Sequence, residues 1–277
     1  MNAKVTPMPA RRHADMPAFP IDTGRAHPAR VYDHWLGGKD NYACDRKVGD
    51  AMTAQIPETP QSCLDNRGFL IRAVQHLATE EGIRQFLDIG SGLPTSPNIH
   101  EVAQDIDPRA RVVYVDNDPI VHLHGQSLLT STPQGATGYI HADLRRAEQI
   151  LHQATQTLDS SRPVALVLAA LLHFIPENHD PAGIVRRLMD PLPSGSALIL
   201  SHMTGNGADE NYVQYVKQTW ASGGVTMHLR DREHLGVFFN GLDLLEPGIV
   251  PVHQWRPQQE DQQRPRWWLW SGVALKP

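Results

Sequence analysis

Two glycines and two carboxylates are spaced in this sequence as they would be in a nucleoside-binding site. Gly90, Ser91 and Gly92 follow a short apolar run that contains Asp88, and Asp116 ends the next apolar run, 24 positions after Gly92. Residues without a Cβ allow a sharp turn and a close approach to a ligand. One loop, one helix and one strand later, Asp116 would lie beside the same turn, where its carboxylate can accept hydrogen bonds from two ribose hydroxyls.

The kind of nucleoside ligand depends on the residues around the glycines. A glycine pair in a tight turn without any ligand is the simplest alternative. Dinucleotide sites place a third glycine three positions after the second, under the pyrophosphate, whereas this chain has Thr95 there. Asp88 would repel a pyrophosphate but would suit a cationic amino group. The segment therefore favours a nucleoside with an amino acid group over a dinucleotide.

A third apolar run, 138–142, ends in Asp143 and Leu144. An acid at this strand end could accept a hydrogen bond from an adenine amino group, while Leu144 packs on the ring. A fourth run, 163–170, leads into a Leu-His-Phe segment that contains His173. Together these strand ends resemble those of the class I S-adenosylmethionine-dependent methyltransferases.

More narrowly, the chain is similar to a family of bacterial S-adenosyl methyltransferases of largely unknown substrate. Segments 29–42, 66–70, 90–95 and 241–248 carry this resemblance, which covers nearly the whole length after the first twenty residues. It implies S-adenosyl-L-methionine as the cofactor. The expected cofactor-binding residues are Asp88, Gly90, Ser91, Gly92, Asp116, Asn117, Asp143, Leu144, Ala169 and Arg67. Arg67 could reach the methionine carboxylate, and a surface salt bridge is the alternative.

The acceptor of the methyl group is not specified by these motifs. Methyl transfer needs mainly proximity and orientation. If the acceptor is a hydroxyl, His173 is the candidate catalytic base; alternatively it only lines the pocket or hydrogen-bonds a carbonyl. The chain lacks the Asn/Asp-Pro-Pro-aromatic signature of amino methylases, so a small-molecule acceptor is expected. A non-catalytic S-adenosylmethionine sensor and a nicotinamide-dependent oxidoreductase are the competing hypotheses.

The N-terminal segment concentrates polar and aromatic side chains around Gly37 and Gly38. Tyr32, Asp33, Asn41 and Tyr42 are the candidates for contacts with a substrate or for a lid over the cofactor. A helical hairpin packed on the sheet edge explains the same pattern without any ligand.

Composition limits the remaining function classes. The 277 residues include 25 Lys and Arg against 30 Asp and Glu, a net charge of −5. A nucleic-acid partner therefore has little electrostatic support. No run reaches the length of a membrane span, and the proline-rich N-terminus lacks the apolar core of a signal peptide, so we expect a cytoplasmic protein with reduced cysteines. No metal-ligand spacing occurs among the histidines, and the oligomeric state is not indicated.

These residues must be positioned by alternating strands and helices. The pattern predicts an α/β fold: a Rossmann-like, seven-stranded, mostly parallel sheet with one antiparallel strand and helices on both faces. We expect a disordered tail over 1–20, an N-terminal helical extension or lid over 21–82, and a methyltransferase domain over 83–277. The last two strands are predicted over 243–255 and 266–275, joined by a Pro- and Gln-rich segment and therefore antiparallel.

Overall fold

Apolar runs form five parallel strands at the centre of the computed structural model, which describes residues 21–257 and 269–277. In chain order these strands are β1 (Gln85–Ile89), β2 (Arg111–Asp116), β3 (Ala136–His141), β4 (Ala165–Ala169) and β5 (Ala197–Met203). Their side chains are apolar on both faces because helices cover the sheet on both sides. The predicted parallel core is confirmed.

The strand order is β3-β2-β1-β4-β5-β8-β6. β8 (Leu269–Leu275) runs antiparallel to β5, and β6 (Asp243–Leu244) and β7 (Val250–Pro251) both pair antiparallel with β8. β8 is thus the expected antiparallel strand. Between β1 and β4 the chain reverses its direction of progress across the sheet, and such switch points form the ligand crevice of open α/β sheets.

The prediction of one continuous strand over 243–255 is wrong. That stretch forms the two short strands β6 and β7 and then a 3-10 helix, η3 (Val252–Gln254), so the sheet of the described residues has eight strands instead of seven. Pro247 has no N–H to donate to a ladder, and Gly248 has φ of +80° with its N–H bonded to the carbonyl of Leu245. This turn interrupts the strand.

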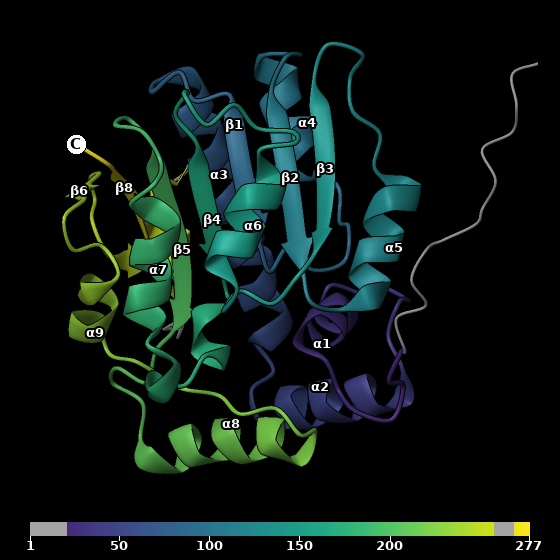
Figure 1. Cartoon of the computed structure of the whole chain (residues 1–277). Helices are drawn as coiled ribbons and strands as arrows, with labels where there is room; N and C mark the ends of the chain where they lie inside the picture. Colours follow the sequence, from purple (N-terminus) through teal and green to yellow (C-terminus); the bar gives the residue numbers. More distant parts are fainter. Residues whose placement is uncertain (1–20, 258–268) are drawn as a thin grey trace, which may run out of the picture.

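Helices cover the two faces of the sheet (Figure 1). One core holds alternate strand residues such as Phe86 and Val112 with α3 (Thr59–Thr79) and α4 (Ile99–Ile106). The other holds the intervening residues such as Leu87 and Val113 with the helices α6 (Ala147–Ala154), α7 (Pro181–Met189) and α9 (Arg232–Val237). Asp88 is a charged residue on the face of β1 that α3 covers.

Three helices gather below the carboxyl ends of the strands in Figure 1: α1 (Pro28–Trp35), α2 (Ala43–Gln55) and α8 (Glu210–Ser222). α2 packs against both of the others. Gly37, with φ of +78°, ends α1, and the carbonyl of Asp33 accepts the N–H of Gly38 at 2.8 Å. The expected tail over 1–20 lies outside the described residues.

Three further helical elements follow β2 and β4. Helix α5 (Pro119–Leu128) follows β2, and its N-terminal residues pack with Leu93 of the loop after β1. The 3-10 helices η1 (Leu172–Phe174) and η2 (Glu177–His179) follow β4. Within the described part of the chain, no helix is both long and apolar enough to cross a bilayer.

Candidate functional site

The glycine turn lies where β1 ends. Gly90 and Gly92 have φ of +76° and +67°, values that favour glycine. The N–H of Gly90 donates to the carbonyl of Val115 on β2 at 2.7 Å, which holds the turn against the neighbouring strand. A Cβ on Gly90 would lie 2.8 Å from a methyl group of Leu171, so this position has no room for a side chain.

Asp116 connects the ends of β1 and β2. Its Oδ2 accepts the N–H of Gly92 at 3.0 Å, and its Oδ1 accepts the N–H of Asp118 at 2.9 Å. Burial raises the pKa of this carboxyl group, and nearby His27 opposes that rise. Each oxygen can accept one more hydrogen bond. The carboxylate therefore fixes both loops and still has capacity for two ligand hydroxyls.

Asp88 and Arg67 lie together at the other end of the turn. Asp88 is 5% exposed, and burial raises its pKa to about 7 although the charge of Arg67 acts in the opposite direction. The Arg67 guanidinium donates to the carbonyls of Thr95 and Pro97, the latter at 2.8 Å. Arg67 thus braces the loop after Gly92 and places a positive charge beside Asp88. These two carbonyls, and not the surface acid named as the alternative, are its hydrogen-bond partners in the described part of the chain.

The end of β3 carries Asp143 and Leu144, and both line the cavity. Asp143 is bound by Arg145: its Oδ1 accepts from the backbone N–H and Nε, at 2.9 and 2.8 Å, and its Oδ2 accepts from Nη2. This contact lowers the pKa of Asp143. A carboxylate has about four acceptor positions, so one remains for a ligand.

The N-terminal segment reaches the same region through His27, a residue that the sequence did not indicate. His27, the residue before α1, has Nε2 3.1 Å from Oδ1 of Asn117 and Nδ1 3.2 Å from Oδ2 of Asp118. Arg30 is buried with its Nε 3.3 Å from the same oxygen of Asp118. Ninety positions separate His27 from Asn117, so only the folded chain brings them together.

A hydrogen-bonded relay fixes the end of β4. Ala170 has φ of +51°, uncommon for a residue with a side chain, and its N–H donates to the Ser201 hydroxyl oxygen at 2.9 Å. That hydroxyl donates to Asn66 Oδ1 at 2.7 Å, and Asn66 Nδ2 donates to the Tyr32 oxygen at 3.2 Å. Tyr32 in turn donates to the carbonyl of Cys63 at 2.9 Å. The relay joins α1, α3 and β5 around the cavity.

The other candidate lid residues make contacts within the N-terminal segment itself. Asp33 Oδ2 accepts the N–H of Asp40 at 3.0 Å and Nδ2 of Asn41 at 2.9 Å, which closes the turn between α1 and α2. The ring of Tyr42 lies under the Arg30 guanidinium, 5.2 Å away. Tyr32 and Asp33 line the cavity, but Asn41 and Tyr42 are not among the lining residues. The structure therefore does not bring these two to the ligand space.

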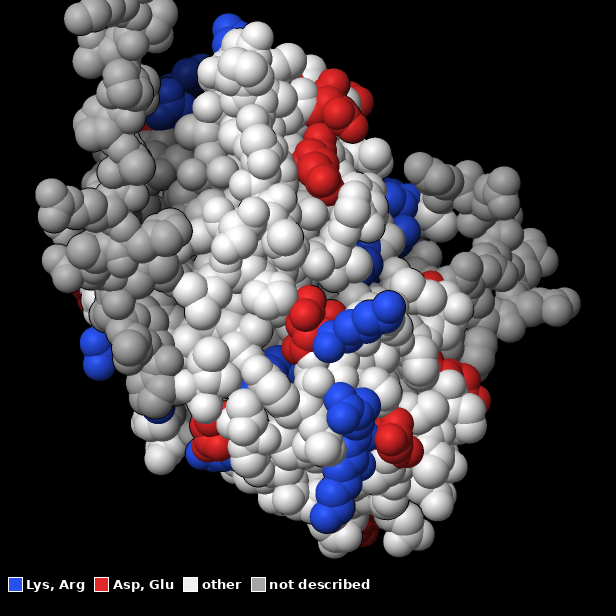
Figure 2. Space-filling view, turned by 90° about the vertical axis from the view of Figure 1, so that its right-hand side faces the viewer, with Lys and Arg blue, Asp and Glu red and all other residues white. Residues whose placement is uncertain are grey.

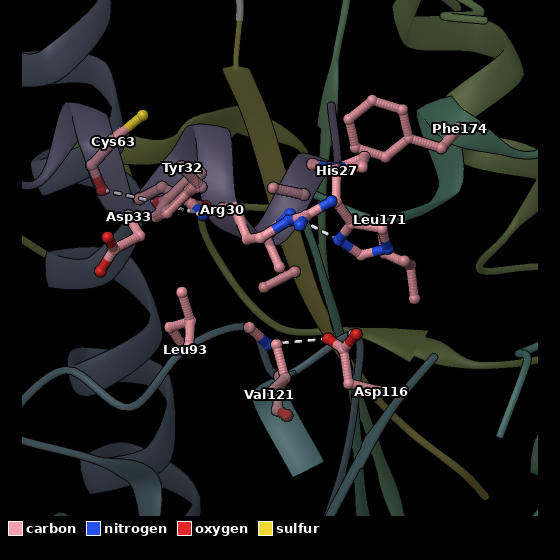
Figure 3. Close-up of a pocket in the computed structure, with 18 of the residues that line it drawn as sticks. His27, Arg30, Tyr32, Asp33, Cys63, Leu93, Asp116, Val121, Leu171 and Phe174 are labelled. Atoms are coloured by element: carbon pink, nitrogen blue, oxygen red, sulfur yellow. Dashed lines mark hydrogen bonds between the residues drawn. The ribbon is translucent and has the colours of Figure 1, made fainter. Parts of the chain in front are cut away.

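A cavity of about 950 Å³ connects the glycine turn, Asp116, Asp143 and Tyr32. In Figure 3, Arg30 and Asp33 of α1 lie on one side of it, and Leu93, Val121 and Asp116 on the other. Beyond Phe174 the cavity extends under α8. We call this part the acceptor chamber and define it by five large side chains: Trp35, Met52, Phe174, Trp220 and Met227. Spacing motifs do not identify them, because they come from three distant segments.

His173 stands between the glycine turn and the acceptor chamber. It is 4% exposed and lines the cavity, and its Nδ1 accepts the N–H of Met203 at 3.2 Å. Burial lowers its pKa well below the usual value, and the neighbouring His202 and Arg230 lower it further. His173 therefore lines the pocket, and its side-chain partner is a backbone N–H instead of the carbonyl that was expected.

Arg230, not anticipated from the sequence, holds the loop that carries His173. Its Nη1 donates to the carbonyl of Leu172 at 2.9 Å and its Nη2 to that of Ile175 at 2.7 Å. Nη1 also lies 2.9 Å from Nε2 of His202, and Nε donates to Glu177 at 2.6 Å. This guanidinium thus connects η1, η2 and β5.

Comparison with known proteins decides the family. The model of the S-adenosyl methyltransferase family matches residues 14–277. The chain belongs to the S-adenosyl methyltransferase family. A DUF574-family protein from Streptomyces avermitilis is 48% identical to this methyltransferase, with a TM-score of 0.89 over 93% of this chain and 100% of the other. A candidate methyltransferase from Thermobifida fusca is 37% identical, with a TM-score of 0.83 over 92% and 96%. No curated protein matches the sequence.

The cofactor of this family is S-adenosyl-L-methionine, and the residues of the methyltransferase fit it. Where a Cβ on Gly92 would point, there is no atom within 4 Å. Asp116 has free acceptor positions, and Asp88 offers a buried carboxyl group to an amino group. The resemblance inferred from the strand ends is therefore confirmed at the level of family and cofactor.

Proposed function

We propose that the methyltransferase acts on a small-molecule acceptor bound in the acceptor chamber. The observation that carries this proposal is the continuity of the cavity from Asp143 at one end to Trp220 at the other. Its volume of about 950 Å³ lies at the upper end of the range for small-molecule sites. One continuous cavity can thus hold a nucleoside cofactor and a second small molecule.

The residues at the strand ends would hold the cofactor. Asp116, with Asn117 beside it, would bind the ribose, and Asp143 and Leu144 would bind the adenine. Asp88 would bind the amino group of the methionine portion. When bound, S-adenosyl-L-methionine supplies an electrophilic methyl group on a positively charged sulfur.

Arg67 and Ala169 would complete this subsite. Arg67 already donates two hydrogen bonds to the loop after Gly92, and its remaining N–H groups could bind a carboxylate. Ala169 ends β4 beside the glycine turn and lines the cavity.

The N-terminal extension and α8 would close the site. α1 and α2 lie over the strand ends, and α8 packs on α2. Tyr32, through its relay to Ala170, ties this cover to the end of β4. Exclusion of water and fixed orientation are the main contributions that a protein makes to methyl transfer.

The surface does not favour a nucleic-acid acceptor. Figure 2 shows the side of the molecule where β3 and α5 lie, and there the Lys and Arg side chains alternate with Asp and Glu among neutral residues. The net charge of −5 also opposes binding to a polyanion.

Transfer of an isotope-labelled methyl group tests the proposal. The full-length protein is incubated with methyl-labelled S-adenosyl-L-methionine and a bacterial extract separated by size into metabolites and macromolecules. We expect label only in the metabolite fraction, and none with the Gly92→Val variant, whose side chain would enter the cofactor space. Label in the nucleic-acid or protein fraction would overturn the small-molecule acceptor. Cofactor binding without transfer to any fraction would indicate a sensor.

A further inference from the structure

We propose that the acceptor is an aromatic compound with an acidic hydroxyl group, which binds in the acceptor chamber as its oxygen anion and accepts a hydrogen bond from Nε2 of His173. The inference rests on the proposed function, since it concerns the acceptor of the same site. It assigns His173 as a hydrogen-bond donor to the reacting oxygen instead of a base.

The backbone determines which nitrogen of His173 carries the proton. The N–H of Met203 can only donate, and it lies 3.2 Å from Nδ1. Nδ1 must therefore present its lone pair, and in the neutral ring the proton is on Nε2. Within the described residues Nε2 makes no hydrogen bond, and the ring lines the cavity. Nε2–H is thus a donor available to a ligand.

Neighbouring groups reinforce this state of the ring. Arg230 Nη1 lies 2.9 Å from Nε2 of His202, and Nδ1 of His202 lies 2.6 Å from the carbonyl of Met203. Because arginine only donates, His202 accepts at Nε2 and donates from Nδ1. A positive charge on His173 would be repelled by Arg230 and would lack solvation. His173 therefore stays neutral, with its lone pair occupied by Met203, and cannot remove a proton from the acceptor without breaking that bond.

The shape of the acceptor chamber favours an aromatic ring. The rings of His173 and Phe174 are 4.4 Å apart between centroids, those of Phe174 and Trp220 5.2 Å, and those of Trp220 and Trp35 5.7 Å. This row of ring contacts runs from the His173 ring across the chamber. Met52 and Met227 complete it with flexible apolar side chains. A flat apolar molecule can stack or pack edge-on against these walls.

The buried titratable groups of the described lining provide no base in this chamber. The Tyr32 hydroxyl donates to a carbonyl, and burial raises its pKa. Burial also raises the pKa of Tyr212. Asp33 is bound within its own turn. Glu58 and His179 are exposed to solvent. A hydroxyl acceptor that is acidic enough to lose its proton to solvent on binding therefore needs no buried base.

Counting lone pairs selects oxygen as the nucleophile. A pyridine-type nitrogen has one lone pair and cannot both accept the Nε2–H bond and attack. An oxygen anion has three. One pair accepts from His173, and another forms the bond to the methyl carbon while the carbon–sulfur bond breaks and its electrons stay on sulfur. The anion becomes a neutral methyl ether, His173 keeps its proton, and charge is conserved because the sulfonium becomes a thioether.

The ionisation of bound 4-nitrophenol tests this inference without turnover. The phenolate absorbance is titrated with pH in the presence of full-length protein and sinefungin, a cofactor analogue with an amine in place of the methylsulfonium group. We expect the apparent pKa of the bound phenol to fall by about 1 unit, because the charged form gains a hydrogen bond and an opposite charge. An unchanged or raised pKa, or no binding of 4-nitrophenol, would overturn the proposal.

Two variants separate a donor from a base. His173→Gln keeps an N–H near the position of Nε2, and His173→Phe removes it. We expect the glutamine variant to retain most of the pKa shift and most of the methyl transfer to 4-nitrophenol. The phenylalanine variant should lose the pKa shift, and its kcat/KM for methyl transfer should fall roughly tenfold or more. Equal loss in both variants would identify a base and contradict the proposal.

The tautomer can also be observed directly in the wild-type protein. Nitrogen-15 spectra of histidine-labelled protein, with His173 assigned by its absence in His173→Gln, should show a protonated Nε2 and an unprotonated Nδ1 at neutral pH. A protonated Nδ1 would overturn the inference. Calorimetry with S-adenosylhomocysteine keeps the two claims apart: if it binds while 4-nitrophenol does not ionise, only the acceptor assignment fails, and if it does not bind, the proposed function fails too.

Discussion

Three aspartates at three strand ends differ in what holds them. Asp116 is fixed by two backbone N–H groups, Asp143 by Arg145, and Asp88 by no hydrogen bond among those that the described residues show. Their positions could be predicted because Asp116 and Asp143 follow apolar runs of fixed spacing and Asp88 lies two residues before the glycine turn. Their interaction partners could not be predicted, because no sequence pattern marks Arg145 and because His27 comes from a distant segment. For Asn41 and Tyr42 the residue types suggested ligand contacts, but the Asn41 side chain bonds Asp33 within a turn and the Tyr42 ring lies under Arg30.

Replacement of Asp116 should weaken cofactor binding strongly. In Asp116→Ala the ribose hydroxyls lose their acceptor, and the N–H groups of Gly92 and Asp118 lose theirs. We expect the affinity for S-adenosylhomocysteine to fall roughly 10- to 100-fold, as for the loss of charged hydrogen bonds. Calorimetry measures this, with Asp105→Ala, an exposed aspartate of α4, as the matched control. Equal affinity of both variants would exclude a ribose contact for Asp116.

Asp88 should make stability depend on pH. Its pKa is about 7 in the folded protein and near 4 in the unfolded chain. The folded state therefore binds more protons between these values, so the contribution of Asp88 to stability is fully present below pH 4 and is lost as pH rises to 7. Without cofactor, Asp88→Asn should raise the Tm more at pH 8 than at pH 5. Thermal unfolding at both values checks this, and an equal gain at both would contradict the raised pKa.

At the scale of elements, the parallel strands were the most predictable part. β1, β2, β4 and β5 are apolar runs bounded by turn residues, and helices of expected length connect them. The prediction of one strand over 243–255 was wrong because a turn at Pro247 and Gly248 interrupts its apolar residues. The alternation of residue types alone did not indicate that turn. The hydrogen-bonded relay from Ala170 to Cys63 was not predicted from the sequence either. It joins four segments through residue types that occur throughout proteins.

The Ser201 hydroxyl should stabilise the fold through this relay. Ser201→Ala would leave the buried Asn66 oxygen without its donor and weaken the bond to the N–H of Ala170. We expect the free energy of unfolding to fall by about 1–3 kcal/mol. Urea denaturation measures it, against Ser127→Ala on the exposed side of α5. A change no larger than that of the control would show that the relay contributes nothing.

The contact of His27 with the loop after β2 should slow dissociation of the cofactor. His27→Ala removes the contacts to Asn117 and Asp118 that hold the start of α1 over the cofactor site. We expect S-adenosylhomocysteine to dissociate about tenfold faster, corresponding to roughly 1.4 kcal/mol. Stopped-flow dissociation compares it with His152→Ala, an exposed histidine of α6. Unchanged dissociation would mean that α1 does not act as a lid.

On the scale of the whole molecule, the site is assembled from segments far apart in the chain. The strand ends carry the residues proposed to bind the cofactor, while α1, α2 and α8 cover the cavity and carry three of the five side chains that define the acceptor chamber. The sequence predicted the first part from spacing and the family resemblance. The sequence could not predict the acceptor chamber, because the chamber depends on how α1 and α2 pack with the distant helix α8.

Calorimetry of the full-length protein with S-adenosylhomocysteine and with NAD tests the central claim most directly. Asp88 before the turn and Thr95 in place of a third glycine favour the sulfur nucleoside and disfavour a pyrophosphate. We predict saturable binding of S-adenosylhomocysteine at a single site per chain and no measurable binding of NAD. Saturable binding of NAD with no response to S-adenosylhomocysteine would contradict the account.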